Sequence, residues 1–85
     1  MNQMLDSHCI KVIIDMIIFL EFSDEDVVNP DSAIEVIENV ASELKLMDYK
    51  YKKDFLKKIE ELSHDYTGKQ KDFVKNLPEV LGIST

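Results

Sequence analysis

The first half of the chain contains a long run of apolar residues. In the segment 4–22 the polar side chains of Ser7, Lys11 and Asp15 recur every four residues, so on a helix they would share one stripe. Many of the remaining residues are β-branched and favour strands, but the run is longer than a typical strand. The sequence therefore predicts a helix over 4–22. Because this helix is apolar on nearly all sides, we expect it to be the central helix, buried by neighbours from several directions.

A polar segment separates this helix from the next one. Ser23 followed by Asp26 is typical of a helix cap, so a short helical turn is expected there. Asn29 before Pro30 predicts the start of a second helix over 30–47, because the first helical position accommodates proline well. The apolar residues that recur at helical spacing in it are expected to face the core: Ile34, Ile37, Val40, Ala41, Leu44 and Met47.

Two more helices are predicted in the second half of the chain. Asp48 is a candidate cap for a helix over 49–64, and Gly68 suits a left-handed residue at its end. A short helix is expected over 69–76. The apolar residues assigned to the core in this half are Phe55, Ile59, Leu62, Tyr66, Phe73, Leu77, Leu81 and Ile83. The expected fold is all-α, a single domain over 1–85 built as a bundle of about four helices.

Composition agrees with a small helical domain. The chain has 85 residues and only two glycines and two prolines, which leaves little turn chemistry for an all-β fold. A single cysteine, Cys9, excludes an internal disulfide and offers no metal-binding cysteine spacing, so a cytoplasmic location is expected. The apolar run is interrupted by charges and falls short of the ~20 residues of a membrane span, so no membrane association is expected.

Charge is distributed unevenly along the chain. Residues 1–44 hold ten acidic residues against one lysine, a net charge of −9, whereas residues 45–85 hold nine lysines against seven acidic residues, a net charge of +2. The chain contains no arginine, so a guanidinium cannot recognise phosphate groups in a bidentate way. An acidic chain of this kind is poorly suited to nucleic acids, and a basic protein partner is expected instead.

Catalytic and metal-binding patterns are weak. The two histidines, His8 and His64, have no serine, cysteine or acid at a spacing that suggests a catalytic or metal-binding set. A calcium loop beginning at Asp24 fails, because Val28 supplies no side-chain oxygen at the fifth position and Asn29 stands where the turn glycine is needed. We therefore expect a binding protein rather than an enzyme, with no cofactor and no metal.

The acidic surface provides the candidate partner-binding site. Its carboxylates have almost no compensating lysine, so they repel one another, and a cationic partner would relieve that repulsion. The tyrosines that follow the second helix are candidate amphipathic anchors. The residues expected to contact the partner are Glu21, Asp24, Glu25, Asp26, Asp31, Glu35, Glu38, Ser42, Tyr49 and Tyr51.

A family resemblance accompanies this pattern. The stretch 19–33, with Glu38 and the sequence Ala41-Ser42-Glu43-Leu44 after it, resembles small bacterial proteins of toxin–immunity pairs. In size, helicity and acidity the chain is also similar to the immunity proteins of nuclease colicins and of contact-dependent growth inhibition systems. The resemblance implies that the chain binds a cognate toxin, commonly a basic nuclease, and blocks its substrate site. Nuclease-colicin immunity proteins carry a Tyr-Tyr-Pro signature, where this chain has Tyr49-Lys50-Tyr51.

The sequence leaves two alternative functions open. The stretch that begins Asp31-Ser32-Ala33 resembles the Asp-Ser-Leu motif of acyl carrier proteins, which implies a phosphopantetheine group on Ser32. The chain departs from that motif at Ala33, where leucine is usual, and at Asn29-Pro30, where a glycine-containing loop is usual. The other alternative is a non-enzymatic acidic adaptor with a different basic partner.

Overall fold

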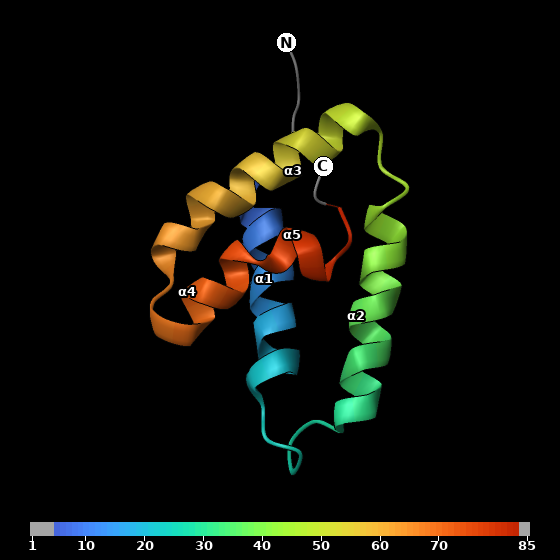
Figure 1. Cartoon of the computed structure of the whole chain (residues 1–85), viewed down its shortest axis with the longest axis vertical. Coiled ribbons are helices and arrows are strands. Elements are labelled where there is room, and N and C mark those ends of the chain that lie inside the picture. Colours follow the sequence, from blue (N-terminus) through green and yellow to red (C-terminus); the bar gives the residue numbers. More distant parts are fainter. Residues whose placement is uncertain (1–4, 84–85) are drawn as a thin grey trace.

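A computed structural model describes residues 5–83 of the chain, and it is helical in the way that the sequence predicts. The helices are α1 (Ser7–Phe22), α2 (Pro30–Leu44), α3 (Tyr49–Leu62), α4 (Gly68–Lys75) and α5 (Leu77–Val80), with a short 3-10 helix, η1 (Ser63–Asp65), after α3 (Figure 1). Residues 5–83 contain no strand. The all-α prediction is confirmed, and the fifth helix, α5, is a single turn that the sequence did not indicate.

Helix α1 is flanked by a polar residue at each end, Asp6 and Ser23. The Asp6 carboxylate accepts hydrogen bonds from the backbone N–H groups of His8, at 2.7 Å, and Cys9, at 3.4 Å, so it satisfies donors that have no partner within the helix. At the other end, the Ser23 N–H donates to the Phe19 carbonyl and closes the last turn. The first residue of the predicted helix, Met4, lies outside the described residues.

The loop between α1 and α2 contains the predicted helical turn, displaced by one residue. The Asp24 carbonyl accepts from the N–H groups of both Val27 and Val28, at 2.8 and 2.9 Å, which makes one closed turn but no helix. Ser23 does not cap this turn, because no backbone N–H of the turn donates to its hydroxyl; its own N–H closes α1. The turn brings the chain directly to Asn29 and the start of α2.

Helix α2 starts where the sequence predicts. The Asn29 side chain accepts from the Ser32 N–H at 3.0 Å, and Pro30 occupies the first turn. One of the predicted core positions is wrong, because Ile34 is 55% exposed while Ala33 is buried. Successive residues turn by about 100° around a helix, so a face centred on Ala33 and Ile37 places Ile34 at its border. The helix ends at Leu44, three residues before the predicted end.

Helix α3 begins at Tyr49 as predicted but ends at Leu62 instead of His64. The Asp48 side chain makes no capping hydrogen bond, and the Asp48 carbonyl accepts from the first turn instead. The Ser63 hydroxyl, which is fully buried, donates to the Glu60 carbonyl at 2.6 Å as the chain tightens into η1. Gly68 is left-handed, with φ of +58°, but it opens α4 rather than closing α3.

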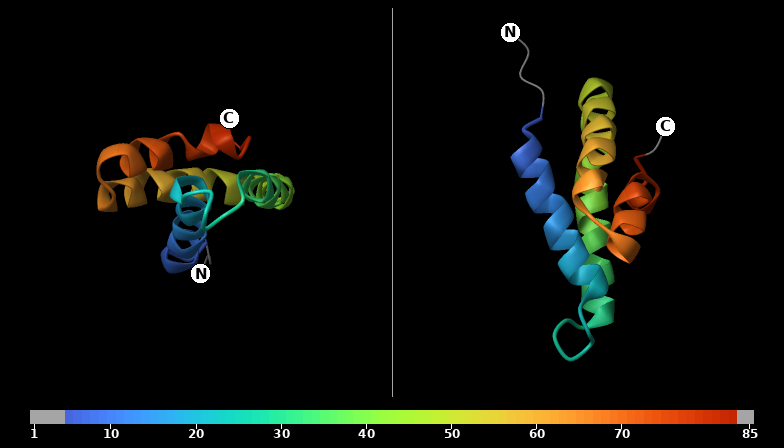
Figure 2. Two further views of the ribbon diagram at one scale, coloured as in Figure 1. Left: turned by 90° about the horizontal axis from the view of Figure 1, so that it is seen from below. Right: turned by 90° about the vertical axis from the view of Figure 1, so that its left-hand side faces the viewer.

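The helices form three layers, with α2 and α3 in the middle. Helix α1 lies on one side of this layer, and α4 and α5 lie on the other side (Figure 2). Helix α3 contacts α1, α4 and α5, so its buried side chains link the outer layers. The core cluster consists of Ile10, Ile14, Ile17, Ile18, Ala41, Phe55, Ile59, Tyr66, Val74, Leu77, Leu81 and Ile83.

The position of α1 differs from the prediction. It forms an outer layer, so it is not a central helix surrounded by neighbours (Figure 2). Its inner face is buried, with Ile14 and Ile17 at 0% and 1% exposure, whereas Val12 and Met16 on the outer face are 57% and 64% exposed. The reason is that α2 and α3 cover only the inner side, while α4 and α5 pack on the far side of α3.

A carboxylate on α3 holds the chain that precedes α1. The Leu5 N–H donates to Asp54 Oδ2 at 3.0 Å, and the Lys58 ammonium pairs with the same carboxylate at 2.8 Å. Both charged side chains are largely covered, at 9% and 18% exposure. The hydrogen bond from Lys58, together with that from Leu5, holds the pKa of Asp54 below its ordinary value despite partial desolvation.

Replacing Asp54 by Asn is expected to lower the free energy of unfolding at neutral pH. The loss should be about 1–3 kcal/mol, because a hydrogen-bonded charge partner is removed from Lys58. A lowered pKa means that the carboxylate stabilises the fold above its unfolded pKa of about 3.9, and that this contribution disappears as the pH falls through the folded pKa. Urea unfolding at several pH values should therefore show the difference between the two chains shrinking in acid.

Glu60→Gln provides the matched control, since this exposed carboxylate lies on the same helix. It should change the stability by less than about 0.5 kcal/mol at any of these pH values. Equal stability of wild type and Asp54→Asn at neutral pH would contradict the role given to this carboxylate.

Candidate partner-binding site

The predicted acidic stripe lies on the outer face of α2. Asp31, Glu35, Glu38 and Ser42 are all exposed, and their spacing aligns them along the side of the helix opposite the buried Ala33. The salt bridges within residues 5–83 join Lys11 to Asp15 and Lys58 to Asp54, so no α2 carboxylate takes part in one. The stripe therefore presents its charges directly to solvent.

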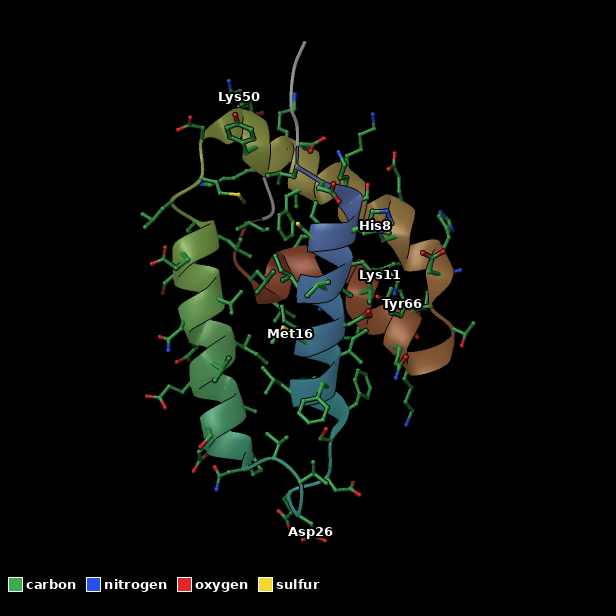
Figure 3. All side chains as sticks on the ribbon, turned by 180° about the vertical axis from the view of Figure 1, so that it is seen from behind. His8, Lys11, Met16, Asp26, Lys50 and Tyr66 are labelled. Atoms are coloured by element: carbon green, nitrogen blue, oxygen red, sulfur yellow. The ribbon has the colours of Figure 1, made fainter. Side chains whose placement is uncertain are left out.

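The acidic residues of the loop extend this surface at one end. Glu21, Asp24, Glu25 and Asp26 are all exposed, and they lie at the end of α1 and in the turn that leads to α2. Figure 3 shows Asp26 at the tip of this loop. Asp31 is in the first turn of α2, so the acidic stripe begins where the acidic loop ends, and the two form one continuous surface.

The two predicted tyrosines lie at the opposite end of α2. This helix of 15 residues is about 22 Å long, and Tyr49 and Tyr51 follow it at the start of α3. The Lys53 ammonium lies 5.6 Å from the centre of the Tyr49 ring, and the Lys50 ammonium lies 5.1 Å from that of Tyr51. Tyr49 is exposed and Tyr51 is half-buried. The structure thus groups the tyrosines with lysines and not with the acidic loop.

The other residues singled out by the sequence lie apart from one another. His8, Cys9 and His64 are exposed, and Ser32 is exposed on the first turn of α2. Within the part of the chain that the structure describes, no group of three His, Cys, Asp or Glu side chains is arranged to hold a metal ion.

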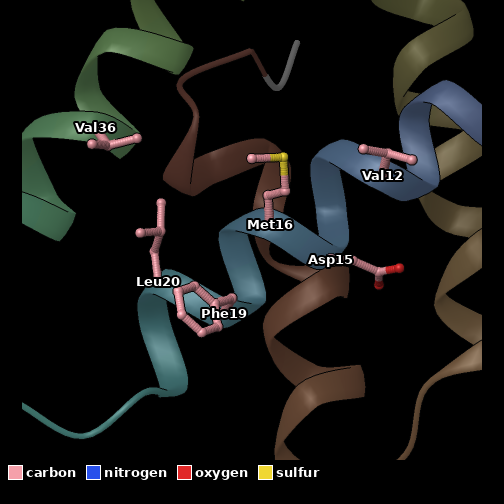
Figure 4. A pocket seen from close by; sticks show the side chains of 6 residues that line it. All are labelled: Val12, Asp15, Met16, Phe19, Leu20 and Val36. Carbon is pink, nitrogen blue, oxygen red and sulfur yellow. The ribbon is translucent and has the colours of Figure 1, made fainter. Parts of the chain in front are cut away.

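An apolar groove between α1 and α2 is a feature that the sequence did not indicate. One hollow of about 440 Å³ runs along the outer face of α1, and a second, of about 430 Å³, continues it between the two helices. Met16, Leu20 and Val36 line both hollows, so they form one groove. In Figure 4 the side chains of Met16, Phe19 and Leu20 gather on α1, with Val36 beside them on α2.

Carboxylates border this groove on both helices. Asp15 lies at the α1 border and Glu43 at the α2 border. In Figure 4 the Asp15 side chain points away from Val36, toward the outside of the groove. The floor is formed by aliphatic and aromatic side chains, and Glu43 makes no salt bridge within residues 5–83.

The one lysine of this half of the chain is engaged at the Asp15 border. The Lys11 ammonium lies 3.1 Å from the Asp15 carboxylate and 3.2 Å from the Tyr66 hydroxyl, which itself donates to Asp15. The hydrogen bond from Tyr66, followed by that from Lys11, lowers the pKa of Asp15. Contacts with Tyr66 and then Asp15 raise the pKa of Lys11, while burial and the bond to Asp15 raise that of Tyr66. The pKa shifts of Asp15 and Lys11 favour their charged forms, and that of Tyr66 favours the neutral phenol that donates to Asp15.

The sequence does not specify this groove, but a first helix that is apolar on nearly all sides is consistent with part of it remaining uncovered. A helix that is apolar on all sides needs cover on all sides, and a chain of 85 residues has few other helices to supply it. Apolar patches that remain open on a folded protein are typical of interaction surfaces.

Comparisons with known proteins add no relative. No family model, no curated protein and no solved structure matches the chain. Within residues 5–83, no helix combines the length and the apolar character that crossing a membrane requires.

Truncating side chains on the two faces of α1 is expected to change the free energy of unfolding by very different amounts. Ile17→Ala should lower the free energy of unfolding by about 2–5 kcal/mol, because it opens a cavity in the core. Met16→Ala, at the next residue, should change it by less than about 0.5 kcal/mol, since the side chain is exposed. Urea unfolding of the two variants measures this difference. Equal losses of stability would contradict the assignment of Ile17 to the inner face and of Met16 to the outer face.

Proposed function

We propose that this chain is an immunity protein that binds a basic bacterial toxin, such as a nuclease, and occludes the surface to which the toxin binds its substrate. One observation carries the proposal: the exposed carboxylates of the α2 stripe continue into those of the loop, and none of the α2 carboxylates is neutralised by a salt bridge within the described residues. The resemblance of the stretch 19–33 to toxin–immunity proteins supports it.

The physical basis is electrostatic. Like charges along one helix face cost stability in the free protein, and a cationic partner removes that cost on binding. A field of one sign also accelerates encounter with an oppositely charged protein well beyond the ~10⁵–10⁶ M⁻¹s⁻¹ of unsteered association. Rapid capture suits a protein that has to neutralise a toxin before the toxin acts. Occlusion further requires only a rigid surface, and a packed helix such as α2 supplies one.

Co-expression tests the function directly. The chain is produced together with the product of the gene next to its own, and the two proteins are purified through a tag on one of them. A stable complex, with growth of cells that the neighbouring product alone would arrest, is the expected result. A neighbouring product that is harmless by itself, or that forms no complex with the chain, would refute the immunity function.

Charge reversal on α2 is expected to separate binding from folding. The Glu35→Lys, Glu38→Lys variant should keep its unfolding free energy or gain slightly, because repulsion is relieved. Its binding to the toxin should weaken by about 2–5 kcal/mol if the carboxylates are desolvated in the complex. At the rim of the contact the loss would instead appear in the association rate and disappear at high salt. Calorimetry and stopped-flow kinetics at two salt concentrations measure both quantities.

The matched control is Glu60→Lys, Glu61→Lys on α3, which changes the net charge of the chain by the same amount at another exposed site. It should affect binding far less. Lys50→Glu and Lys53→Glu test the lysine-rich surface in the same assay. If these lysine variants abolish protection while the α2 variant retains it, the partner binds the start of α3 and the acidic stripe is a solvated surface.

A further inference from the structure

The outer face of α1 is apolar, exposed and flanked by acidic side chains. Val12, Met16 and Phe19 are 57%, 64% and 55% exposed, and Val36 on α2 is 43% exposed. We infer that the groove between α1 and α2 binds an amphipathic helix of the partner, one whose apolar row is flanked by lysine or arginine. This inference rests on the proposed function and deepens it, because it states which part of a basic partner is bound and where.

The shape of the groove suits a helix. Val12, Met16 and Phe19 are spaced i, i+4 and i+7, so they form one ridge of about 10 Å along α1. Figure 3, which views the molecule from the side of α1, shows α1 and α2 side by side, with Met16 on α1. A third helix placed against this pair would bury its own i, i+3, i+4 and i+7 side chains between Met16, Leu20 and Val36, as in other helix-in-groove complexes.

Charge decides which helix fits. The groove is bordered by Asp15 on α1 and by Glu43 on α2, in the half of the chain whose net charge is −9. Lys11, the one cation of that half, already contacts Asp15 and Tyr66. Because Asp15 is already paired with Lys11, Glu43 is the border carboxylate that a partner would meet. A bound helix with acidic flanks would place like charges opposite Glu43, whereas basic flanks would pair with it.

A second copy of this chain does not complement the groove. Two α1 faces packed on each other would oppose the carboxylates of one copy to those of the other, which costs free energy. The lysine-rich surface of α3 has the complementary charge, but its hollow is lined by Lys50, Lys53, Asp54 and Lys57 and offers no apolar row. A head-to-tail contact between α3 and the groove would build rings or open chains of several copies rather than a dimer.

The test uses two synthetic helical peptides of about 18 residues, or about five turns. Both carry the same row of leucines at positions i, i+3, i+4 and i+7, and the flanking positions are lysine in one peptide and glutamate in the other. Each is titrated into the full chain, labelled at the methionine methyl groups, and followed by NMR. The lysine-flanked peptide should shift the signal of the exposed Met16 methyl group and leave that of Met47, which packs against the core, nearly unchanged.

Substitutions then locate the contact. Met16→Gln and Val36→Thr each remove an apolar side chain that is exposed in the free chain and would be buried by the peptide. Each should weaken binding of the lysine-flanked peptide by about tenfold, as expected for the loss of buried aliphatic surface. The matched control is Ile34→Thr, because Ile34 is also an exposed apolar residue, at 55%, but lies on the opposite border of α2, so the affinity should not change. Glu43→Lys should reduce the preference for lysine flanks over glutamate flanks, whereas Glu60→Lys should preserve it. Circular dichroism verifies that each variant remains folded.

Three outcomes would overturn the inference. Equal binding of both peptides would show that the groove selects only apolar surface, and a shift confined to Met47, which lies just before α3, would place the site elsewhere. Failure of both peptides to bind would exclude a helix, and sedimentation equilibrium would then show whether a second copy occupies the groove, through a dimer that Met16→Gln dissociates.

The experiments distinguish a failure of the proposed function from a failure of this inference. If the neighbouring gene product is no toxin but the lysine-flanked peptide shifts the Met16 signal, the groove remains a helix-binding site and only the immunity function is refuted. If a toxin complex forms and tolerates both Met16→Gln and Val36→Thr without loss of affinity, the function stands and the groove is not the contact.

Discussion

The packing of the isoleucine face of α1 against α3 is the contact on which the other layers depend. Ile10, Ile14 and Ile17 are fully buried, and they share one cluster with Phe55 and Ile59 of α3. Burial of side chains of this size contributes about 1.5–3 kcal/mol each, so these five residues supply a large share of the stability of a small domain. Because α4 and α5 pack on α3 from the other side, they rely on the same helix being held in place.

Local patterns predicted most of the helices but not the position of α1. Asn29 and Pro30 indicated the start of α2, and helical spacing indicated that Phe55 and Ile59 face the core, because both signals are contained in a few neighbouring residues. A helix that is apolar all round carries no information about which side faces inward. The exposure of Ile34 has a similar origin, since the border of a helix face depends on how closely its neighbours approach.

The candidate site, too, could be predicted only where local spacing determines the position of a side chain. The spacing of Glu35 and Glu38 was sufficient to place both on the outer face of α2, since residues three and four apart share a face. The separation of Tyr49 from the acidic loop follows from the length of α2, which intervenes. The groove at Met16 and Val36 depends on how two helices pack together and on what leaves them uncovered, so no local signal in either helix specifies it.

Neighbouring residues of α1 are subject to different constraints, one set to folding and the other only to what the outer face contacts. Ile17 is held by the requirements of folding, whereas Met16, directly before it, is mostly exposed to solvent in the free chain. Selection for a new partner can therefore change the outer row of α1 without altering the inner row that keeps the domain folded. Families built on such a helix can diversify in what they recognise while their architecture stays constant, because the two sets of positions alternate in sequence yet point in opposite directions.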